Sequence, residues 1–400
     1  MTVPEKVDIT PEEMESVEKM RARFKNDLPQ AMYEDTNLFL RFLKARDFNL
    51  SQSEIMLRKH LQWRKAKKVD TIIEEFKPFE VLEKYMPINA FAFDKEDSIC
   101  YYLPVSKFDV KGIHRSAKPS DIDSYLIRSL ELGERAIIER AENRKGKLPG
   151  YVLVYDLEDL PFATATDKKG IEDLIRTAKI IQDNYPERLK AVLIINASNL
   201  FTIPFAILKK FLAPNVVKKI HVYGADRWRE HLLKLIDADK IPAFLGGKKT
   251  DPDGNPLCKS IINFAGPVPE SYHLKNTKNP LCGDPRSKKL VIPRTSTIEI
   301  DLDIVVPGSL IQWEFEAKSK DVAFGLFFKE KSGDDVKVTE LVPIIRLECE
   351  LCSETGVYKC EMPGTYTLVF DNSYSWIRSK EIYYKVSVVN PKEHEVQLER

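Results

Sequence analysis

Cysteines are one kind of side chain in this 400-residue sequence that could do chemistry. Cys349 and Cys352 have two residues between them, and Cys360 follows nearby, which is one half of a zinc-site pattern. No second pair of ligands at zinc-site spacing follows, and the six histidines are scattered along the chain. We therefore interpret these cysteines as loop thiols and expect no metal site.

Carboxylates gather directly after an apolar run at residues 151–155, where an α/β enzyme could keep an acid–base pair. They are Asp156, Glu158 and Asp159. The sequence gives them no neighbouring base, nucleophile or metal ligand, so helix capping is the better interpretation. The run also lacks the Gly-x-Gly-x-x-Gly that a dinucleotide fold places after a strand. We expect no catalytic residue and no cofactor, and we predict that the protein is not an enzyme.

The most unusual stretch is 200–212, which is apolar around most of a predicted helix. Its principal stripe, at spacings of four, three and four, consists of Phe201, Phe205, Leu208 and Leu212. Ile207 and Phe211 widen this stripe and leave little polar surface. A helix that covers a sheet needs one apolar stripe, so the second apolar face needs a second apolar neighbour. That neighbour is further protein, a lipid or a membrane.

The segments around this stretch predict an α/β domain over residues 76–249. Short apolar runs bounded by turn residues predict strands at 99–105, 151–155, 191–196 and 220–223. Helical spacing predicts helices at 121–141 and 171–181. Strands that alternate with helices indicate a largely parallel sheet. We expect the two strands that flank 200–212 to be buried.

Residues 1–75 have the pattern of an all-helical cap. Two capping boxes, at 10–13 (Thr-Pro-Glu-Glu) and 51–54 (Ser-Gln-Ser-Glu), predict two helix starts. The run at 38–43 between them is too apolar for an exposed helix, so we expect it to pack against something.

Charge is unevenly distributed within this cap. From 41 to 68 there are nine Lys or Arg against Asp47 and Glu54, so nine minus two gives a local balance of +7. This segment is either a solvated helix face or an electrostatic contact with anionic lipid head groups.

The period of the apolar pattern changes in the last third of the chain. Pro and Gly cluster at 250–270, which predicts a linker. Beyond it, apolar residues alternate with polar ones at a period of two, as at Ile298, Ile300, Leu302 and Ile304. This pattern predicts an antiparallel sandwich of seven or eight strands over residues 271–390.

Overall composition excludes several classes of protein. The formal net charge is +1, so no global field favours nucleic acid. No apolar run approaches the roughly 20 residues of a membrane span. The acidic stretch 1–19 lacks the apolar core of a signal peptide. We expect a cytoplasmic protein with transient membrane association.

Six motifs in the first two thirds of the chain resemble the CRAL-TRIO lipid-binding family. They are 38–48, 185–189 (Tyr-Pro-Glu-Arg-Leu), 196–201, 210–212, 219–220 and 242–247. The segments at 313–315, 324–328 and 366–376 are similar to the GOLD β-sandwich of Golgi-dynamics proteins. The resemblance covers about residues 5–390. It implies an all-helical cap, an α/β lipid-binding domain whose sheet floors a cavity, a mobile gate helix at 200–212, and a jelly-roll-like all-β GOLD domain.

The resemblance also implies a head-group site. In phosphatidylinositol-binding relatives, the Glu of Tyr-Pro-Glu-Arg and a Lys before an Ile hold the inositol, and these match Glu187 and Lys219. Arg46 matches an assisting Arg. The next position is basic in those relatives but is Asp47 here, which leaves neutral ligands such as tocopherol, squalene or related isoprenoids open.

Without the family, these residues have a plainer interpretation. Glu187 would pair with Arg188 or Lys190 at the surface, and Lys219 would be a solvated lysine. The apolar residues that we expect to line the cavity and gate are Tyr101, Leu103, Val152, Val154, Ile175, Ile194, Phe201, Phe205, Leu208, Phe211 and Leu212.

Two functions follow from the resemblance. The first is a lipid-transfer protein that encloses one hydrophobic lipid and moves or presents it between membranes. The second is a lipid-regulated adaptor, in which the sandwich binds a Golgi or signalling protein. The partners implied are a hydrophobic lipid ligand, a membrane surface and a protein partner of the GOLD domain.

Overall fold

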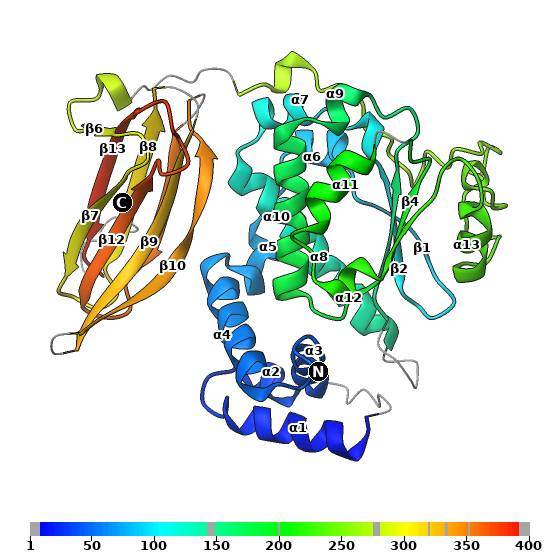
Figure 1. The fold of residues 1–400 in the computed structure, drawn as a ribbon, viewed down its shortest axis with the longest axis horizontal. Helices are drawn as coiled ribbons and strands as arrows, with labels where there is room; N and C mark the ends of the chain where they lie inside the picture. The colour runs from blue at the N-terminus through cyan, green and yellow to red at the C-terminus, as the bar shows by residue number, and fades with distance from the viewer. Residues whose placement is uncertain are drawn as a thin grey trace. The chain divides into compact units, whose positions relative to one another are not determined.

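The computed structural model divides the chain into two compact units, Met1–Ser271 and Tyr272–Arg400. It describes residues 9–141, 149–198, 201–274, 281–318, 321–332, 335–350 and 353–391. Within these residues, no helix is both long enough and apolar enough to cross a bilayer. Figure 1 shows the elements of each unit.

The chain begins with helices, as expected. They are α1 (Pro11–Ala22), α2 (Gln30–Glu34), α3 (Thr36–Lys44) and α4 (Leu50–Ala66). Five apolar side chains of α3 are buried, namely Leu38, Phe39, Leu40, Phe42 and Leu43. They form a core with α1 and α4, so the apolar run at 38–43 does dock on other protein.

The two predicted capping boxes have different outcomes. Thr10 and Glu13 form the reciprocal box that begins α1. The box at 51–54 was a wrong prediction, because α4 begins at Leu50, two residues before a helix capped by Ser51 would begin. Asn49 caps this helix by accepting a hydrogen bond from the backbone of Gln52. Glu54 is left to bind arginines instead.

A five-stranded sheet is the centre of the first unit. Its order is β1 (Asn89–Phe93), β2 (Ile99–Pro104), β3 (Tyr151–Asp156), β4 (Leu189–Ile195) and β5 (Ile220–Val222). The pairs from β2 to β5 are parallel, which confirms the predicted sheet. β1 forms an antiparallel hairpin with β2 that the sequence analysis missed. β5 is an edge strand with Val222 45% exposed, so it is not buried as expected.

Helices cover both faces of this sheet. The remaining helices are α5 (Ile72–Glu75), α6 (Glu80–Tyr85), α7 (Val110–Ser116), α8 (Pro119–Ala141), α9 (Phe162–Ala165), α10 (Lys168–Asn184), α11 (Thr202–Lys209), α12 (Pro214–Val217) and α13 (Trp228–Leu235). Figure 1 shows α8, α10 and α11 on one face of the sheet and α13 on the other. The space between the sheet and the first group of helices is therefore where a cavity can form.

The segment 250–270, expected to be a linker, packs on the first unit. Ile262 is 2% exposed and belongs to the same core as β2 and β3. Asn89 donates to the carbonyl of Asn263 at 2.8 Å, and the backbone N–H of Asn263 donates back to Asn89 at 2.9 Å. Its Pro and Gly residues build an ordered loop here, and the boundary between the units falls after Ser271.

The second unit is the expected antiparallel sandwich. Its strands are β6 (Lys288–Ile292), β7 (Thr297–Ile304), β8 (Leu310–Ala317), β9 (Asp321–Ser332), β10 (Asp335–Glu348), β11 (Glu354–Lys359), β12 (Gly364–Asp371) and β13 (Lys380–Val389). They form two four-stranded sheets, in the orders β10-β9-β12-β7 and β11-β8-β13-β6.

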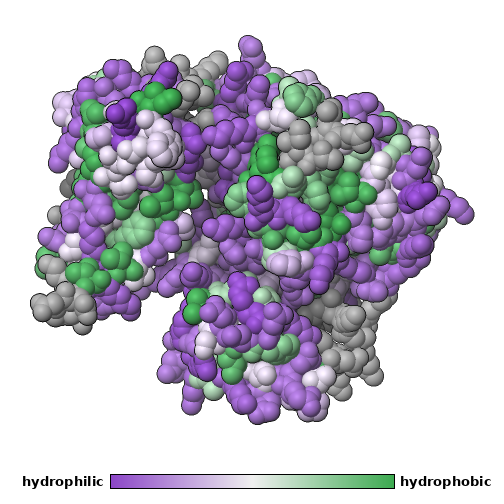
Figure 2. Space-filling view, in the orientation of Figure 1, coloured by the Kyte–Doolittle hydropathy of each residue, from purple (hydrophilic) through white to green (hydrophobic). Residues whose placement is uncertain are grey.

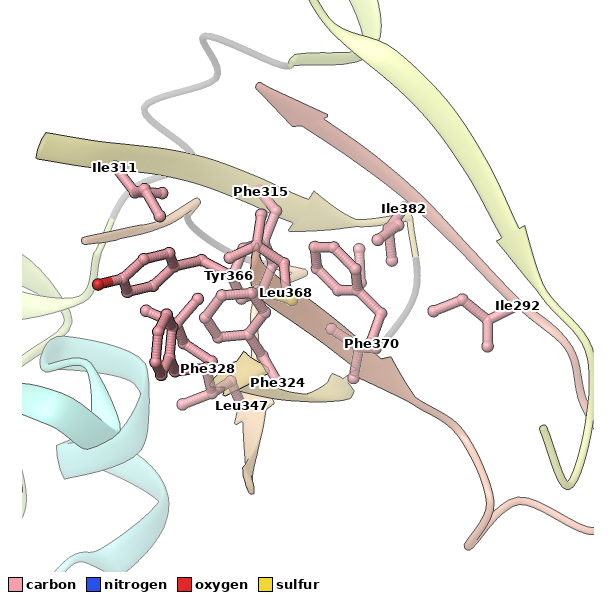
Figure 3. Packing of buried hydrophobic residues seen from close by; sticks show 14 of the residues in the cluster. Ile292, Ile311, Phe315, Phe324, Phe328, Leu347, Tyr366, Leu368, Phe370 and Ile382 are labelled. Atoms are coloured by element: carbon pink, nitrogen blue, oxygen red, sulfur yellow. The ribbon is translucent and has the colours of Figure 1, made fainter. Parts of the chain in front are cut away.

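Aromatic rings fill the space between these two sheets. Phe315 of β8 lies 4.7 Å from Phe324 of β9 and 5.2 Å from Phe370 of β12, measured between ring centroids. Figure 3 shows these rings together with Phe328 and Tyr366 at the centre of the core. The alternation of the sequence thus gives this unit a core of its own.

Candidate functional site

A cavity of about 320 Å³ lies between the sheet and the helices of the first unit. Its walls come from β2 to β5, α7, α8, α10, the segment 201–212 and the loop that follows α6. The side chains that line it are predominantly apolar, among them Leu103, Leu153 and Ile194. A space of this size and lining fits an apolar molecule better than a polar substrate.

The strand β3 shows which face of the sheet the cavity occupies. Leu153 and Tyr155 line the cavity. Val152 and Val154 point to the opposite face, where they pack in a core with Trp228 of α13. The expectation that both valines line the cavity is therefore corrected. Successive side chains of a strand alternate between faces, and the residues at 151–155 are apolar on both, so sequence could not choose between them.

Other expected residues also lie outside the lining. Tyr101 packs in a cluster with Tyr151 and Leu130 beneath α8. Its ring therefore contacts the helix instead of lining the cavity. Ile175 of α10 does not line the cavity, although Leu174 on the same helix does. Ile175 lies about 100° further around the helix than Leu174, at the edge of the inward face. Both are corrections to the expected cavity.

The predicted gate lies over the cavity and divides into inner and outer residues. Phe201, Leu208 and Leu212 line the cavity. Phe205 stacks on Phe201 at 5.6 Å between ring centroids and joins the packed cluster of β4 rather than the lining. Phe211 is 55% exposed. Figure 2 shows apolar surface gathered where Figure 1 draws α10 and α11.

The predicted head-group residues all border the cavity, and two of them form an ion pair. Glu187, Lys219 and Arg46 all line it. The ammonium Nζ of Lys219 lies 3.6 Å from Oε2 of Glu187. Asn215 donates to the other oxygen of Glu187 at 3.4 Å. Asp47 is exposed and does not line the cavity.

Comparison with known protein families identifies three domains in this chain. The CRAL/TRIO domain matches residues 83–247, the CRAL/TRIO N-terminal domain matches 16–59, and the Golgi-dynamics membrane-trafficking (GOLD) domain matches 330–389. The chain contains a CRAL/TRIO domain. Residues 16–59 are its N-terminal companion, and the sandwich is a GOLD domain.

Several proteins are similar to the whole chain or large parts of it. "Protein ctg-1" of Caenorhabditis elegans is 27% identical over 384 residues, which cover 93% of this chain and 97% of that protein. "Protein real-time" of Anopheles gambiae is 27% identical over 367 residues and 82% of this chain. The chain spans about half the length of that protein, 54%. Among solved structures, that of Sfh5 has a TM-score of 0.45 at 17% identity, and the match covers 65% of this chain and 94% of Sfh5.

Several cations in the basic segment of the helical cap form internal ion pairs. Within the CRAL/TRIO unit, Arg64 binds Glu131 of α8 at 3.3 Å. Arg58 binds Asp27 at 2.7 Å. The pairs Arg41 with Glu134, at 3.9 Å, and Lys44 with Glu13, at 3.2 Å, are of the same kind. At least four of the nine cations are thus paired with carboxylates, two within the cap and two on α8, which leaves fewer of them for a contact with lipid head groups.

Asp156 has a structural role in place of the expected helix cap. It is 7% exposed and accepts hydrogen bonds from the Tyr102 hydroxyl and the Asn196 amide, both at 2.8 Å. These bonds tie together the carboxyl ends of β2, β3 and β4. The helix α9 that follows starts at Phe162, and its N-cap residue, Pro161, makes no side-chain cap hydrogen bond.

No group of three or more His, Cys, Asp or Glu that could hold a metal ion occurs within the described residues. Cys349 is buried in the sandwich core. Cys352 lies outside the described residues.

The structure adds polar lining residues that sequence analysis missed. His114 of α7 and Asp173 of α10 both line the cavity, with 2.7 Å between Nε2 and Oδ2. Burial raises the pKa of Asp173, but His114 and Arg176 outweigh it and hold the pKa below its usual value. Burial raises the pKa of Tyr155 to about 12, so its phenol is neutral. The partners of the His–Asp pair are 59 residues apart, so no local pattern announces them.

Proposed function

We propose that this chain is a carrier that encloses one hydrophobic lipid and moves or presents it between membranes. The observation that carries the proposal is the cavity of about 320 Å³ lined predominantly by apolar side chains. Such a space is a poor site for water, because a buried water molecule needs two to four polar partners. A lipid gains roughly 25 cal/mol for each Å² of apolar area that it moves out of water.

The gate supports transfer as well as storage. Leu208 and Leu212 face the cavity, while Ile207 and Phe211 are 37% and 55% exposed. A helix that is apolar toward both the ligand and the outside can lie on a bilayer when it opens. We propose that this surface provides transient membrane association of a cytoplasmic protein, and that no catalytic step takes place.

The proposed ligands are tocopherol, squalene or a related isoprenoid, with phosphatidylinositol as the alternative. Lys219 and Arg46 at the cavity favour an anionic head group. Glu187 neutralises one of the two cations, and the exposed carboxylate of Asp47 opposes an anion. The balance therefore favours a lipid without a formal charge.

Lipid uptake tests the proposal. Native mass spectrometry of the purified protein should show one bound lipid, and delipidated protein should take up a lipid from a broad panel at one-to-one stoichiometry. A delipidated, folded protein that accepts no lipid of such a panel contradicts the carrier.

A second candidate, the lipid-regulated adaptor, has one observation in its favour. Trp376 and Ile377, in the loop between β12 and β13 of the GOLD domain, are 80% and 85% exposed. Large apolar side chains in water favour a binding partner. Lipid transfer between vesicles in the absence of any other protein separates the two functions, because only the carrier performs it.

A further inference from the structure

The His114–Asp173 pair is a polar group in an otherwise apolar wall. The His114 side chain is 9% exposed and borders the cavity. Its Nε2 is 2.7 Å from Asp173 Oδ2. The other oxygen of Asp173 accepts from Arg176 Nη2 at 2.7 Å, and Arg176 Nε donates to Asp123 at 2.6 Å. The ring is therefore held in one orientation by a chain of charged partners.

The second ring nitrogen, Nδ1 of His114, has no hydrogen-bond partner among the residues that the structure describes. His114 lines the cavity, so a molecule enclosed there can supply a partner for this nitrogen. A hydrocarbon that fills the cavity would leave this atom unpaired.

We propose that His114, oriented by Asp173, binds the hydroxyl group of a lipid alcohol enclosed in the cavity. The inference rests on the proposed function as a lipid carrier and names a chemical class for its ligand. A hydroxyl fits because it can both donate and accept. It pairs with Nδ1 whether that nitrogen is the acceptor of a neutral ring or the donor of a protonated one.

The surrounding charges argue against an anionic group at this place. Asp173 and Asp123 carry two negative charges, and Arg176 carries one positive charge. Even with a protonated His114 the cluster is only neutral. A phosphate or a carboxylate would therefore meet no net positive charge, whereas a neutral hydroxyl loses nothing.

The position of the pair sets the direction in which the lipid lies. Asp173 is near the start of α10, and Gln182, which also lines the cavity, is near its end. Nine residues at about 1.5 Å each place them roughly 13 Å apart. The side chains between them include Leu174 and Ile181. An alcohol bound at His114 would extend its apolar chain along these residues toward Lys219.

Displacement of a fluorescent hydrocarbon from the delipidated full-length chain tests the site. Diphenylhexatriene reports whether the cavity is intact in each protein. Geranylgeraniol, its methyl ether and the corresponding hydrocarbon then compete for the cavity. We expect geranylgeraniol to displace the probe at roughly five- to ten-fold lower concentration than either analogue, which is the worth of one hydrogen bond.

Variants test whether His114 and Asp173 cause this preference for the alcohol. His114→Leu should remove the preference for the alcohol, and Asp173→Asn should weaken it by releasing the ring. His114→Gln, which keeps a donor and an acceptor, should retain part of it. His221→Leu is the matched control, because His221 of β5 does not line the cavity and packs on His231 at 4.8 Å.

The possible failures are distinguishable. If the wild-type chain binds the probe and all three lipids equally well, or if His114→Leu keeps the preference, the hydroxyl site is wrong and the carrier stands. If neither the probe nor any lipid binds, both proposals fall. A His114→Leu chain that does not fold leaves Asp173→Asn and His114→Gln to decide, and equal preference in all of them contradicts the site.

Discussion

The Nζ atom of Lys219 and the Oε2 atom of Glu187 lie 3.6 Å apart beside the cavity, where β4 and β5 begin. The two basic neighbours that could have formed an ion pair with Glu187 bind other carboxylates. Arg188 binds Glu134 at 2.8 Å, and Lys190 binds Asp94 at 2.6 Å. Glu187 has a left-handed backbone, with φ at +60°. This rare conformation for a non-glycine residue separates its side chain from those neighbours.

Replacing Lys219 tests this pair as a head-group site. If the chain binds phosphatidylinositol, Lys219→Met should weaken that binding by roughly 10- to 100-fold, because a hydrogen bond to a charged group is worth about 1.5–3 kcal/mol. Squalene, which has no polar group, should bind the variant no more than a few-fold differently. Vesicle-based lipid exchange measures both. The adjacent and exposed Lys218→Met is the control, and equal losses in the two variants would remove the assignment.

His60 predicts an acid-sensitive cap. It is 4% exposed, and its Nδ1 lies 3.1 Å from Oδ1 of Asn184. Burial, with help from the positive charge of Arg64, lowers the pKa of His60 to about 3, although the Asn184 bond opposes the shift. The unfolded chain has a histidine pKa near 6.5. The unfolded state therefore binds the proton first, and the stability that neutral His60 contributes is complete above about pH 6.5 and falls toward pH 3.

Calorimetry of the first unit between pH 4 and 7 checks this prediction. The slope of unfolding free energy from this one group can approach about 1.4 kcal/mol per pH unit. His60→Gln keeps a polar side chain near Asn184 but does not titrate, so its stability should fall less steeply with acid. Identical slopes for both proteins would mean that His60 is not buried as a neutral ring.

The boundary of the first unit is a third prediction. A chain of residues 1–271 should fold and bind lipid alone, because the core of the sandwich is separate. A chain of residues 1–249 should be less stable by several kcal/mol. It lacks Ile262 and the hydrogen bonds of Asn263, and losing one large buried aliphatic side chain alone costs about 2–5 kcal/mol. Equal melting temperatures for the two chains would show that the segment after 249 is the linker that its composition suggested.

The sequence predicted those elements whose apolar residues recur at a regular local spacing. Strands β2 to β4 and the sandwich architecture were visible because apolar runs and alternation decide them. The face of a strand was not visible where both faces are apolar, as at Val152 and Leu153. Only the fold brings α13 to one side of β3 and the cavity to the other.

Long-range pairing was equally hidden. The charge of the segment 41–68 looked unbalanced because its partners, such as Glu131 and Glu134, lie on α8. The His114–Asp173 pair depends in the same way on how α7 meets α10. Family resemblance supplied Glu187 and Lys219 because they lie in motifs that resemble the family's, whereas a pair outside those motifs had no signal. Only the structure shows the pairs that form between segments far apart in the sequence.

The gate offers the sharpest test of membrane contact. Phe211 is 55% exposed, whereas Phe205 stacks on Phe201 and belongs to a packed cluster. Phe211→Asp should therefore leave the fold intact, and Phe205→Asp should destabilise it. If the open gate buries Phe211 in a bilayer, the variant loses roughly 1.5–3 kcal/mol of apolar transfer and must also place a charge at the acyl boundary, which is expensive.

Co-flotation with vesicles and the rate of lipid transfer measure this effect, with circular dichroism as the folding control. Phe211→Asp should weaken vesicle binding by at least about ten-fold, as those energies imply, and slow transfer in proportion. Phe79→Asp is the matched control, because Phe79 is 53% exposed but precedes α6 and is not part of the gate. Added salt should weaken vesicle binding of both variants equally, since salt screens the surface lysines and not the apolar contact. Normal transfer by a folded Phe211→Asp chain, or an equal loss in Phe79→Asp, would mean that the lipid enters by a route other than 201–212.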